Sequence, residues 1–208
     1  MTPISYFEDA WRRCDEISGL HCYLVGALTG ALSPDELLRS EWVARVSALD
    51  LFVHELVSQK MVEIFEGIRP SCPGYGRFSC STEAIQRVRN AKTPADATAA
   101  FSLDIKSKLT RITFQAPDDI ADGIRMISAC ELWNEIAIRR GASAGTKSTV
   151  AKGLKTDLSL VIDRRNKIAH EGDLQPTIPR TPWPINRADV DFAAQLIEGI
   201  VRDVDAIV

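Results

Sequence analysis

The chain has 208 residues, of which 45% are hydrophobic and 25% charged, and its formal net charge is −3. That length and balance fit one globular domain with a sizeable core, and the charge excludes a broad basic surface, so any nucleic-acid site has to be local. Five irregularly spaced cysteines argue against a disulfide framework, and no apolar run approaches the roughly 20 residues that span a bilayer, so we expect a cytoplasmic protein without membrane contact.

The N-terminal segment, residues 1–30, carries helical periodicity and predicts a first helix over about 5–29. Its apolar positions are Trp11, Ile17, Leu20, Leu24 and Leu28. The spacing of three to four residues places most of them on one side of a helix. We therefore expect this helix to pack against the rest of the domain.

A second, longer helix is predicted from a capping pattern. Ser33 is placed as N-cap, Pro34 at the first helical position, and Glu36 three residues after the serine, which together form a capping box. The helix runs to about Phe65. Its apolar stripe, which needs partner helices, consists of Val43, Val46, Leu49, Val53, Val57, Met61 and Ile64.

The middle of the chain, about 67–117, is predicted as an insertion with short helices. Residues 67–81 contain two prolines and three glycines and predict a loop. Two short helices follow, over about 82–92 and 95–109. After them, a longer helix is expected over about 118–140, ending at Gly141.

The last part of the chain predicts two more helices. One covers 147–171 and ends at Gly172, a typical left-handed C-terminal position. A proline-rich segment follows, and Asn186 caps the final helix. No stretch alternates with the period of a strand, so the fold class we predict is all-α.

The helix over 147–171 ends in a charged stretch, DRRNKIAHEGD, at 163–173. On a helical wheel His170, Asn166 and Asp163 share the side opposite the apolar stripe, and Arg165 lies about 140° from His170. One interpretation is a helix end whose basic side chains favour the negative end of the helix dipole. The other is a reactive site, because histidine can exchange protons near neutral pH.

The six residues RNKIAH (165–170) match the Arg-Asn-x-x-x-His motif of the HEPN superfamily. The wider string LVIDRRNKIAHEGDLQP is similar to the RiboL-PSP-HEPN branch, and LRSEWVARVSALDLFVHELV, LWNEIAIRRG and WPINRADV resemble other helices of that branch. The resemblance covers most of the chain and is weakest over 66–117. It implies a single HEPN-like domain over 1–208, an antiparallel HEPN-type helical bundle with additional short helices.

The resemblance further implies a metal-independent endoribonuclease, often a toxin or antiviral effector, with a composite site where two copies of the motif helix meet across a homodimer. Attack by a ribose 2′-OH needs a base, an acid and a cation for the phosphate, which histidine and arginine supply. The catalytic residues it implies are Arg165, Asn166 and His170. The RNA-binding or supporting candidates are Arg164, Lys167, Asp163, Glu171, Arg139 and Arg140.

Several expectations accompany this hypothesis. No cofactor and no metal are expected, because Cys14, His21, Cys22, Cys72 and Cys80 lack the close spacing of zinc ligands. The expected partners are a second copy, RNA, and an antitoxin or defence-system protein. Some family toxins carry a modified tyrosine two residues past the histidine; Gly172 stands there, which does not support that regulation.

Other interpretations remain open at this point. The chain is also consistent with a catalytically silent HEPN module that binds RNA or a partner protein, or with a structural dimerisation domain. Arg139 and Arg140 either bind RNA phosphate or satisfy a helix dipole. Asp50 and Glu55 either approach the motif helix or serve the fold. His21 and His54 are expected to be partly buried packing residues.

Overall fold

The computed structural model describes residues 1–27 and 34–208, and these residues form an all-α fold, as predicted. Apart from one isolated antiparallel bridge between Leu174 and Pro182, they contain no strand. The helices are α1 (Pro3–Ala27), α2 (Asp35–Phe65), α3 (Thr82–Arg89), α4 (Pro94–Leu109), α5 (Pro117–Arg125), α6 (Leu132–Arg139), α7 (Lys147–Glu171) and α8 (Arg187–Ile207).

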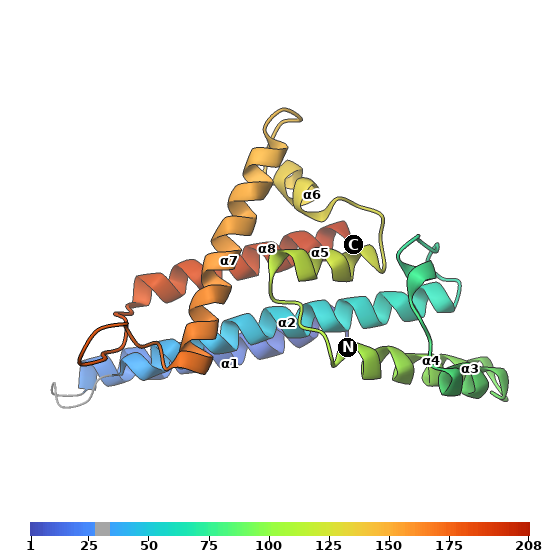
Figure 1. The fold of residues 1–208 in the computed structure, drawn as a ribbon, viewed down its shortest axis with the longest axis horizontal. Coiled ribbons are helices and arrows are strands. Elements are labelled where there is room, and N and C mark those ends of the chain that lie inside the picture. Colours follow the sequence, from blue (N-terminus) through green and yellow to red (C-terminus); the bar gives the residue numbers. More distant parts are fainter. Residues whose placement is uncertain (28–33) are drawn as a thin grey trace.

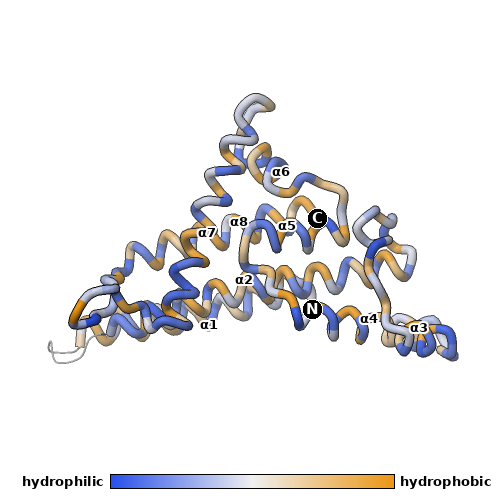
Figure 2. The backbone as a smooth tube through the Cα atoms, in the orientation of Figure 1, coloured by the Kyte–Doolittle hydropathy of each residue, from blue (hydrophilic) through white to orange (hydrophobic). Residues whose placement is uncertain are grey.

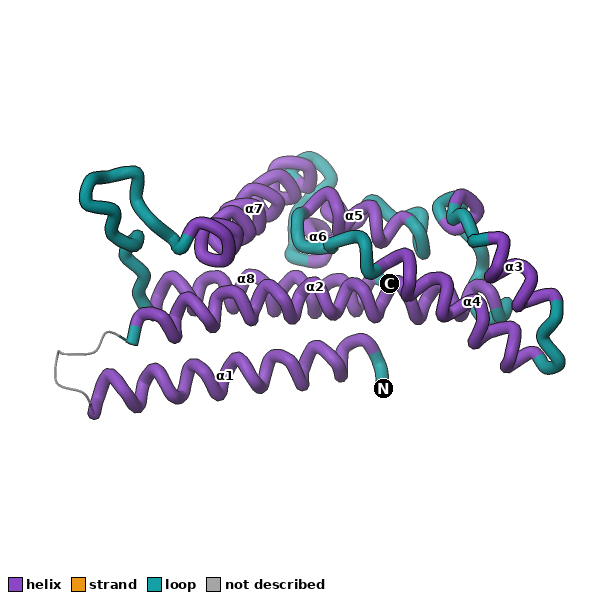
Figure 3. Tube along the Cα trace, turned by 60° about the horizontal axis from the view of Figure 1, so that its bottom comes forward, coloured by secondary structure: helices purple, strands orange, loops and turns teal. Residues whose placement is uncertain are grey.

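Helix α2 is the centre of the fold. It packs against α1, α4, α5, α7 and α8, and its buried residues therefore surround the helix rather than forming one stripe. In Figure 3, α1 lies on one side of α2 and α8, while α5, α6 and α7 lie on the other. Figure 1 shows that α1, α2 and α8 follow the long axis and that α7 crosses them. The prediction that the long helix needs several partner helices is confirmed.

Buried apolar side chains from α1, α2 and α4–α8 form one contiguous core. The colouring of Figure 2 shows hydrophobic residues recurring along α2 and α8 and hydrophilic residues gathering in the last turns of α7. Among residues 1–27 and 34–208, no helix combines the length and the apolar composition that crossing a membrane requires. The last turns of α7 thus differ from the rest of the fold, because their charged side chains are largely exposed whereas most of the other helices contribute to the core.

The helix ends follow several of the predicted capping signals. The side chain of Asn186 accepts a hydrogen bond from the N–H of Asp189, and the Asp189 carboxylate accepts one from the N–H of Asn186, which completes a capping box. Gly172 ends α7 with φ 65°, the left-handed conformation expected at that position. Helix α2 begins at Asp35, one residue later than predicted. The predicted N-cap Ser33 and the predicted end of the first helix at 28–29 lie outside the described residues.

The single helix predicted over 118–140 is wrong, because the chain forms two helices, α5 and α6, joined by 126–131. On one continuous helix, the buried pair Ile120 and Ile124 would lie nearly opposite Trp133 and Ile136. The break lets both apolar sets reach the core, with α5 packed on α2 and α6 packed on α7 and α8. At the break, the Ser128 hydroxyl accepts a hydrogen bond from the Cys130 N–H, which competes with helix continuation.

Smaller differences concern individual positions. Leu20, assigned to the apolar stripe of the first helix, is 48% exposed. The buried side of α1 is formed instead by Phe7, Ala10, Cys14 and His21, so the expectation for His21 is confirmed. His54 is also partly buried, packed edge-on against Phe114. The loop predicted at 67–81 contains one short 3₁₀ turn, η1 (Tyr75–Arg77).

Candidate functional site

The last two turns of α7 separate the motif residues as the helical wheel predicted. His170, Asn166 and Lys167 are exposed, whereas Arg165 is half-buried and its Nε atom has no hydrogen-bond partner. The Arg165 Nη1 atom donates a hydrogen bond to the Asn166 Oδ1 atom at 3.0 Å. One guanidinium nitrogen is thus held by the neighbouring motif residue. Within one chain, the structure does not bring Arg165 and His170 together in one hollow.

After α7 the chain folds back on itself in the 173–184 segment. The Asp173 N–H donates to the Lys167 carbonyl at 3.0 Å, and the Trp183 N–H donates to the Asp173 carbonyl at 2.7 Å. Between them, the Gln175 N–H donates to the Thr181 carbonyl at 2.9 Å. Asp173 has φ 56°, a left-handed conformation that aspartate adopts more readily than most residues. These bonds hold the segment against the end of α7.

A buried ion cluster anchors the same segment to α2. The side chain of Asp173 is fully buried, and its Oδ2 atom accepts hydrogen bonds from Arg39 Nε at 3.0 Å and Arg164 Nη2 at 2.6 Å. Arg39 Nη2 also donates to the Trp183 carbonyl at 2.6 Å. A buried charge is costly unless it is paired, and here two guanidiniums pair with one carboxylate. Arg164, a candidate RNA ligand in the sequence, is therefore part of the fold.

Between the end of α7 and the 173–184 segment lies an open groove of about 620 Å³, which we call the motif groove. Three of its lining residues, Lys167, His170 and Glu171, come from α7. Three more, Gln175, Arg180 and Trp183, come from the segment. Lys167, His170, Glu171 and Arg180 are exposed, and none makes a side-chain hydrogen bond or ion pair within the described ranges.

The motif groove can support proton transfer and anion binding. An imidazole can act as base or acid, and two unpaired cations near it favour a phosphate group. Trp183 adds an aromatic surface that is 38% exposed. This combination suits a phosphodiester better than a neutral ligand.

Arg139 and Arg140 lie elsewhere. At the end of α6, Arg139 Nε and Arg140 Nε bind the two carboxylate oxygens of Asp203 on α8, at 3.0 and 2.6 Å. Helix α6 packs beside the start of α7, at the opposite end from the motif (Figure 1). These two arginines hold α6 to α8, and the structure does not bring them to the motif groove.

Two further candidates serve the fold or face solvent. Asp50 accepts hydrogen bonds from the Phe114 N–H at 2.6 Å and from the Gln115 side chain at 3.3 Å, so it fixes the segment before α5. Asp163 is exposed on the outer side of α7, the side on which Lys167 also lies. Neither residue lines the motif groove.

Sequence reasoning missed the residues that build the other side of the groove. Arg39 and Asp173 lie 134 positions apart, and no local pattern links them. Trp183 and Arg180 carried a weak signal, because a tryptophan between two prolines in a polar segment is unusual for a simple connection. From the sequence, this segment is predicted only as a proline-rich connection between two helices.

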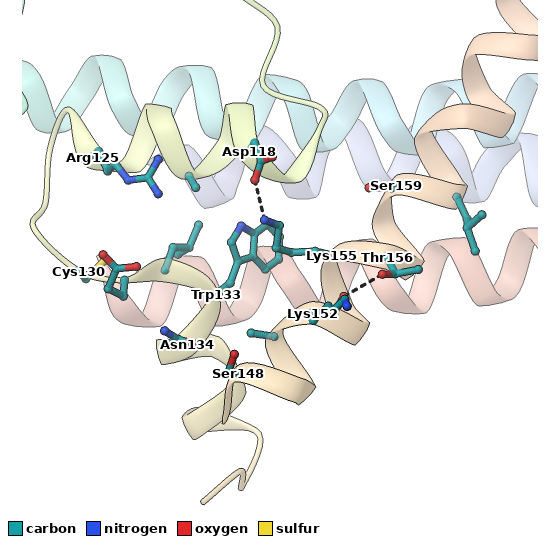
Figure 4. Close-up of a pocket in the computed structure, with 15 residues that line it drawn as sticks. Asp118, Arg125, Cys130, Trp133, Asn134, Ser148, Lys152, Lys155, Thr156 and Ser159 are labelled. Atoms are coloured by element: carbon teal, nitrogen blue, oxygen red, sulfur yellow. Dashed lines mark hydrogen bonds and ion pairs between the residues drawn. The ribbon is translucent and has the colours of Figure 1, made fainter. Parts of the chain in front are cut away.

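A second hollow, of about 540 Å³, lies between α5, α6 and the first half of α7, and we call it the upper hollow. Figure 4 shows Asp118 reaching toward Lys155, whose Nζ atom donates to Asp118 Oδ1 at 2.7 Å. This hydrogen bond lowers the pKa of Asp118. Trp133 is only 7% exposed and donates its indole N–H to the Pro117 carbonyl at 3.0 Å. Lys155 and Asp118 pair with each other, whereas Lys152, Glu131 and Asn134 also line this hollow and make no side-chain hydrogen bond or ion pair within the described residues.

No group of three or more metal-ligating side chains occurs in the part of the chain that the structure describes. All five cysteines are free thiols. Cys14 is buried, and burial raises its pKa to about 11, so it is protonated at neutral pH. These thiols offer neither a metal centre nor a reactive thiolate beside the motif groove.

Comparison of the chain with protein-family models, with curated proteins and with solved structures gives no match. The function proposed for this chain therefore rests on its motif residues and on the geometry of the groove that His170 lines.

Proposed function

We propose that this protein is a metal-independent endoribonuclease of the HEPN type, which cleaves RNA by attack of a ribose 2′-OH on the adjacent phosphate. The observation that carries the proposal is the position of His170. Its exposed imidazole lines a groove with Lys167 and Arg180, two cations that no carboxylate in the described ranges neutralises. A base or acid beside two phosphate-binding cations is the arrangement that the reaction requires.

The reaction also explains why one chain is insufficient. Attack by the 2′-OH needs one group to accept its proton and another to donate a proton to the leaving 5′ oxygen. One motif groove supplies one imidazole. A second copy related by a two-fold axis would supply the second His170, and the family resemblance implies that it also supplies a second Arg165. We therefore propose a homodimer with its site between the two copies of α7.

The outer side of α7 supports this arrangement. Leu160 is 62% exposed there, and Asp163 and Lys167 follow it at intervals of three and four residues on the same side. An exposed leucine on the outer side of a helix suits a self-complementary apolar contact between antiparallel copies of that helix.

The second candidate function is a catalytically silent module that binds RNA or a partner protein. The observation that favours it is the state of Arg165, which is half-buried and hydrogen-bonded to Asn166. A phosphate contact would have to come from its remaining guanidinium nitrogen. In this second function the groove would bind RNA without cleaving it.

The biological setting belongs to the proposal as well. A metal-independent ribonuclease without internal inhibition would damage its own cell, so we propose a toxin or antiviral effector controlled by an antitoxin or a defence-system partner in the cytoplasm. The exposed motif groove is the surface that such a controlling protein would cover.

The test is cleavage of a labelled RNA by purified protein in excess EDTA, with the product ends identified. We expect 2′,3′-cyclic phosphate ends, and we expect His170→Ala to lower the cleavage rate by about 10²- to 10⁴-fold. The control is Lys152→Ala, an exposed α7 residue that lines the upper hollow. Unchanged cleavage by His170→Ala would refute the role of His170, and RNA binding without cleavage by the wild type would establish the silent module.

A further inference from the structure

The motif groove contains a tryptophan whose ring is exposed, unlike two other tryptophans of the chain. Trp42 and Trp133 are each 7% exposed and donate their indole N–H groups to the carbonyls of Val161 and Pro117. Trp183 is 38% exposed, and its indole nitrogen has no partner within the described ranges. Exposed aromatic rings beside cationic side chains are the elements on which single-stranded nucleic acid stacks and binds.

The backbone of Trp183 is fixed although its ring is exposed. Its N–H donates to the Asp173 carbonyl at 2.7 Å, and its carbonyl accepts from Arg39 Nη2 at 2.6 Å. Prolines at 182 and 184 restrict the backbone on both sides. The point from which the ring extends into the groove is therefore fixed.

The charges of the groove select an anion. Lys167 from α7 and Arg180 from the 173–184 segment both line it, together with the single carboxylate of Glu171. The neighbouring arginines, Arg39 and Arg164, are already committed to Asp173. Lys167 and Arg180 are thus the cations of this region that remain available to a ligand.

We propose that the motif groove holds one unpaired nucleotide of RNA next to the cleaved phosphate, with its base stacked on Trp183 and its phosphate bound by Lys167 and Arg180. Its volume of about 620 Å³ lies within the usual range for small-ligand sites, roughly 300–1,000 Å³. A base stacks on an exposed tryptophan only when it has left its own helix, which restricts the substrate to single-stranded or looped RNA. The position of the cleaved phosphate beside His170 rests on the proposed function; the stacking and the anion contacts do not.

Gln175 gives this site a polar edge. Its Nε2 atom donates to Thr181 Oγ1 at 3.4 Å and to the Pro182 carbonyl at 3.1 Å. Its amide oxygen remains an acceptor, which favours a base that presents an N–H group. An acidic peptide would use the two cations but would leave the tryptophan ring without a stacking partner.

The experiment measures binding of a fluorescein-labelled, eight-nucleotide single-stranded RNA in which every ribose is 2′-O-methylated. This probe lacks the attacking hydroxyl, so binding is separated from cleavage. We expect Trp183→Ala to weaken binding about ten-fold or more, and Trp183→Phe to keep it within about three-fold, because a smaller aromatic ring still stacks. Arg180→Ala, an exposed loop substitution, should lower the dependence of log affinity on log salt by about 1, and Lys155→Ala in the upper hollow should not.

Three results would overturn this inference: no binding of the probe by the wild type, equal affinity of Trp183→Ala and the wild type, or tighter binding of the same sequence as a duplex or of an acidic octapeptide. The proposed function can fail separately. If the wild type binds the probe in a Trp183-dependent way but leaves unmodified RNA of the same sequence intact in EDTA, the nucleotide site stands and the nuclease is refuted. If unmodified RNA is cleaved and Trp183→Ala does not change the affinity for the probe, the nuclease stands and the nucleotide site is refuted.

Discussion

Helix α7 borders a hollow near each of its ends, and lysine lines both. In the upper hollow, Lys155 binds Asp118 of α5, and the one tryptophan present turns its indole N–H inward to a backbone carbonyl. In the motif groove, Lys167 binds no side chain in the described ranges, and Trp183 keeps its ring at the surface. The two hollows are similar in size and differ in that Lys155 and Trp133 have partners within the fold, whereas the Lys167 side chain and the indole nitrogen of Trp183 have none within the described ranges.

This difference separates groups that hold the structure together from groups that remain free to bind. The same division runs through the arginines of the chain. Arg39 and Arg164 meet Asp173, and Arg139 and Arg140 meet Asp203. A basic residue in the motif region is therefore no guide to RNA binding by itself; its partner in the fold decides.

The largest effect should come from breaking the buried cluster of Arg39, Arg164 and Asp173, which anchors the 173–184 segment beside the motif groove. Asp173→Ala leaves two guanidiniums facing each other without a carboxylate, and we expect the free energy of unfolding to fall by about 3–5 kcal/mol. Urea denaturation measures it. The control is Glu36→Ala. The Glu36 side chain also pairs with Arg39 but is 76% exposed, so its removal should lower the free energy of unfolding by less than about 1 kcal/mol. Equal losses in the two variants would show that burial of this cluster does not matter.

An effect of intermediate size tests whether the motif groove is half of a site. Wild type and His170→Ala are mixed, allowed to exchange subunits, and assayed for RNA cleavage. If both histidines of a dimer are required, equal amounts leave about a quarter of the wild-type activity rather than about half, because only wild-type pairs are active. A linear dependence on the wild-type fraction would show that each chain works alone.

The smallest effect concerns the upper hollow. The pKa of Asp118 lies below its ordinary value because of Lys155, so this pair contributes stability above the pKa of the unfolded chain and loses it as the pH falls through the folded pKa. Lys155→Ala should raise the pKa of Asp118 toward its ordinary value, as followed by NMR titration of the carboxyl carbon, and should leave RNA affinity unchanged. A loss of RNA affinity in this variant would erase the distinction between the two hollows.

Much of the fold was predictable because its signals are local. The capping pair at Asn186 and Asp189 and the left-handed Gly172 follow from the residues that form them. The break between α5 and α6 was not predicted, although the positions of the apolar residues in the sequence indicate it. The apolar positions before residue 128 and after residue 131 lie on opposite sides of any single helix, and the continuous periodicity within each half hid this change.

The candidate site was predictable in part. The wheel separated His170 from Arg165 correctly, since both belong to one helix whose geometry is known. It could not reveal that Arg164 would pair with Asp173. Asp173 is buried together with Arg39, which comes from a distant part of the chain, and a helical wheel contains only one helix. Trp183 was missed for the same reason: its place in the groove depends on where α2 anchors its carbonyl.

The double anchoring of the 173–184 segment has a consequence for how a ligand would bind. Because Asp173 and Trp183 are fastened to α7 and α2 at either end of the segment, most of the conformational entropy of this wall is lost when the protein folds. A nucleotide entering the groove would meet a preorganised surface and would have only its own strand to order. Affinity for short RNAs should then depend more on the stiffness of the RNA than on that of the protein.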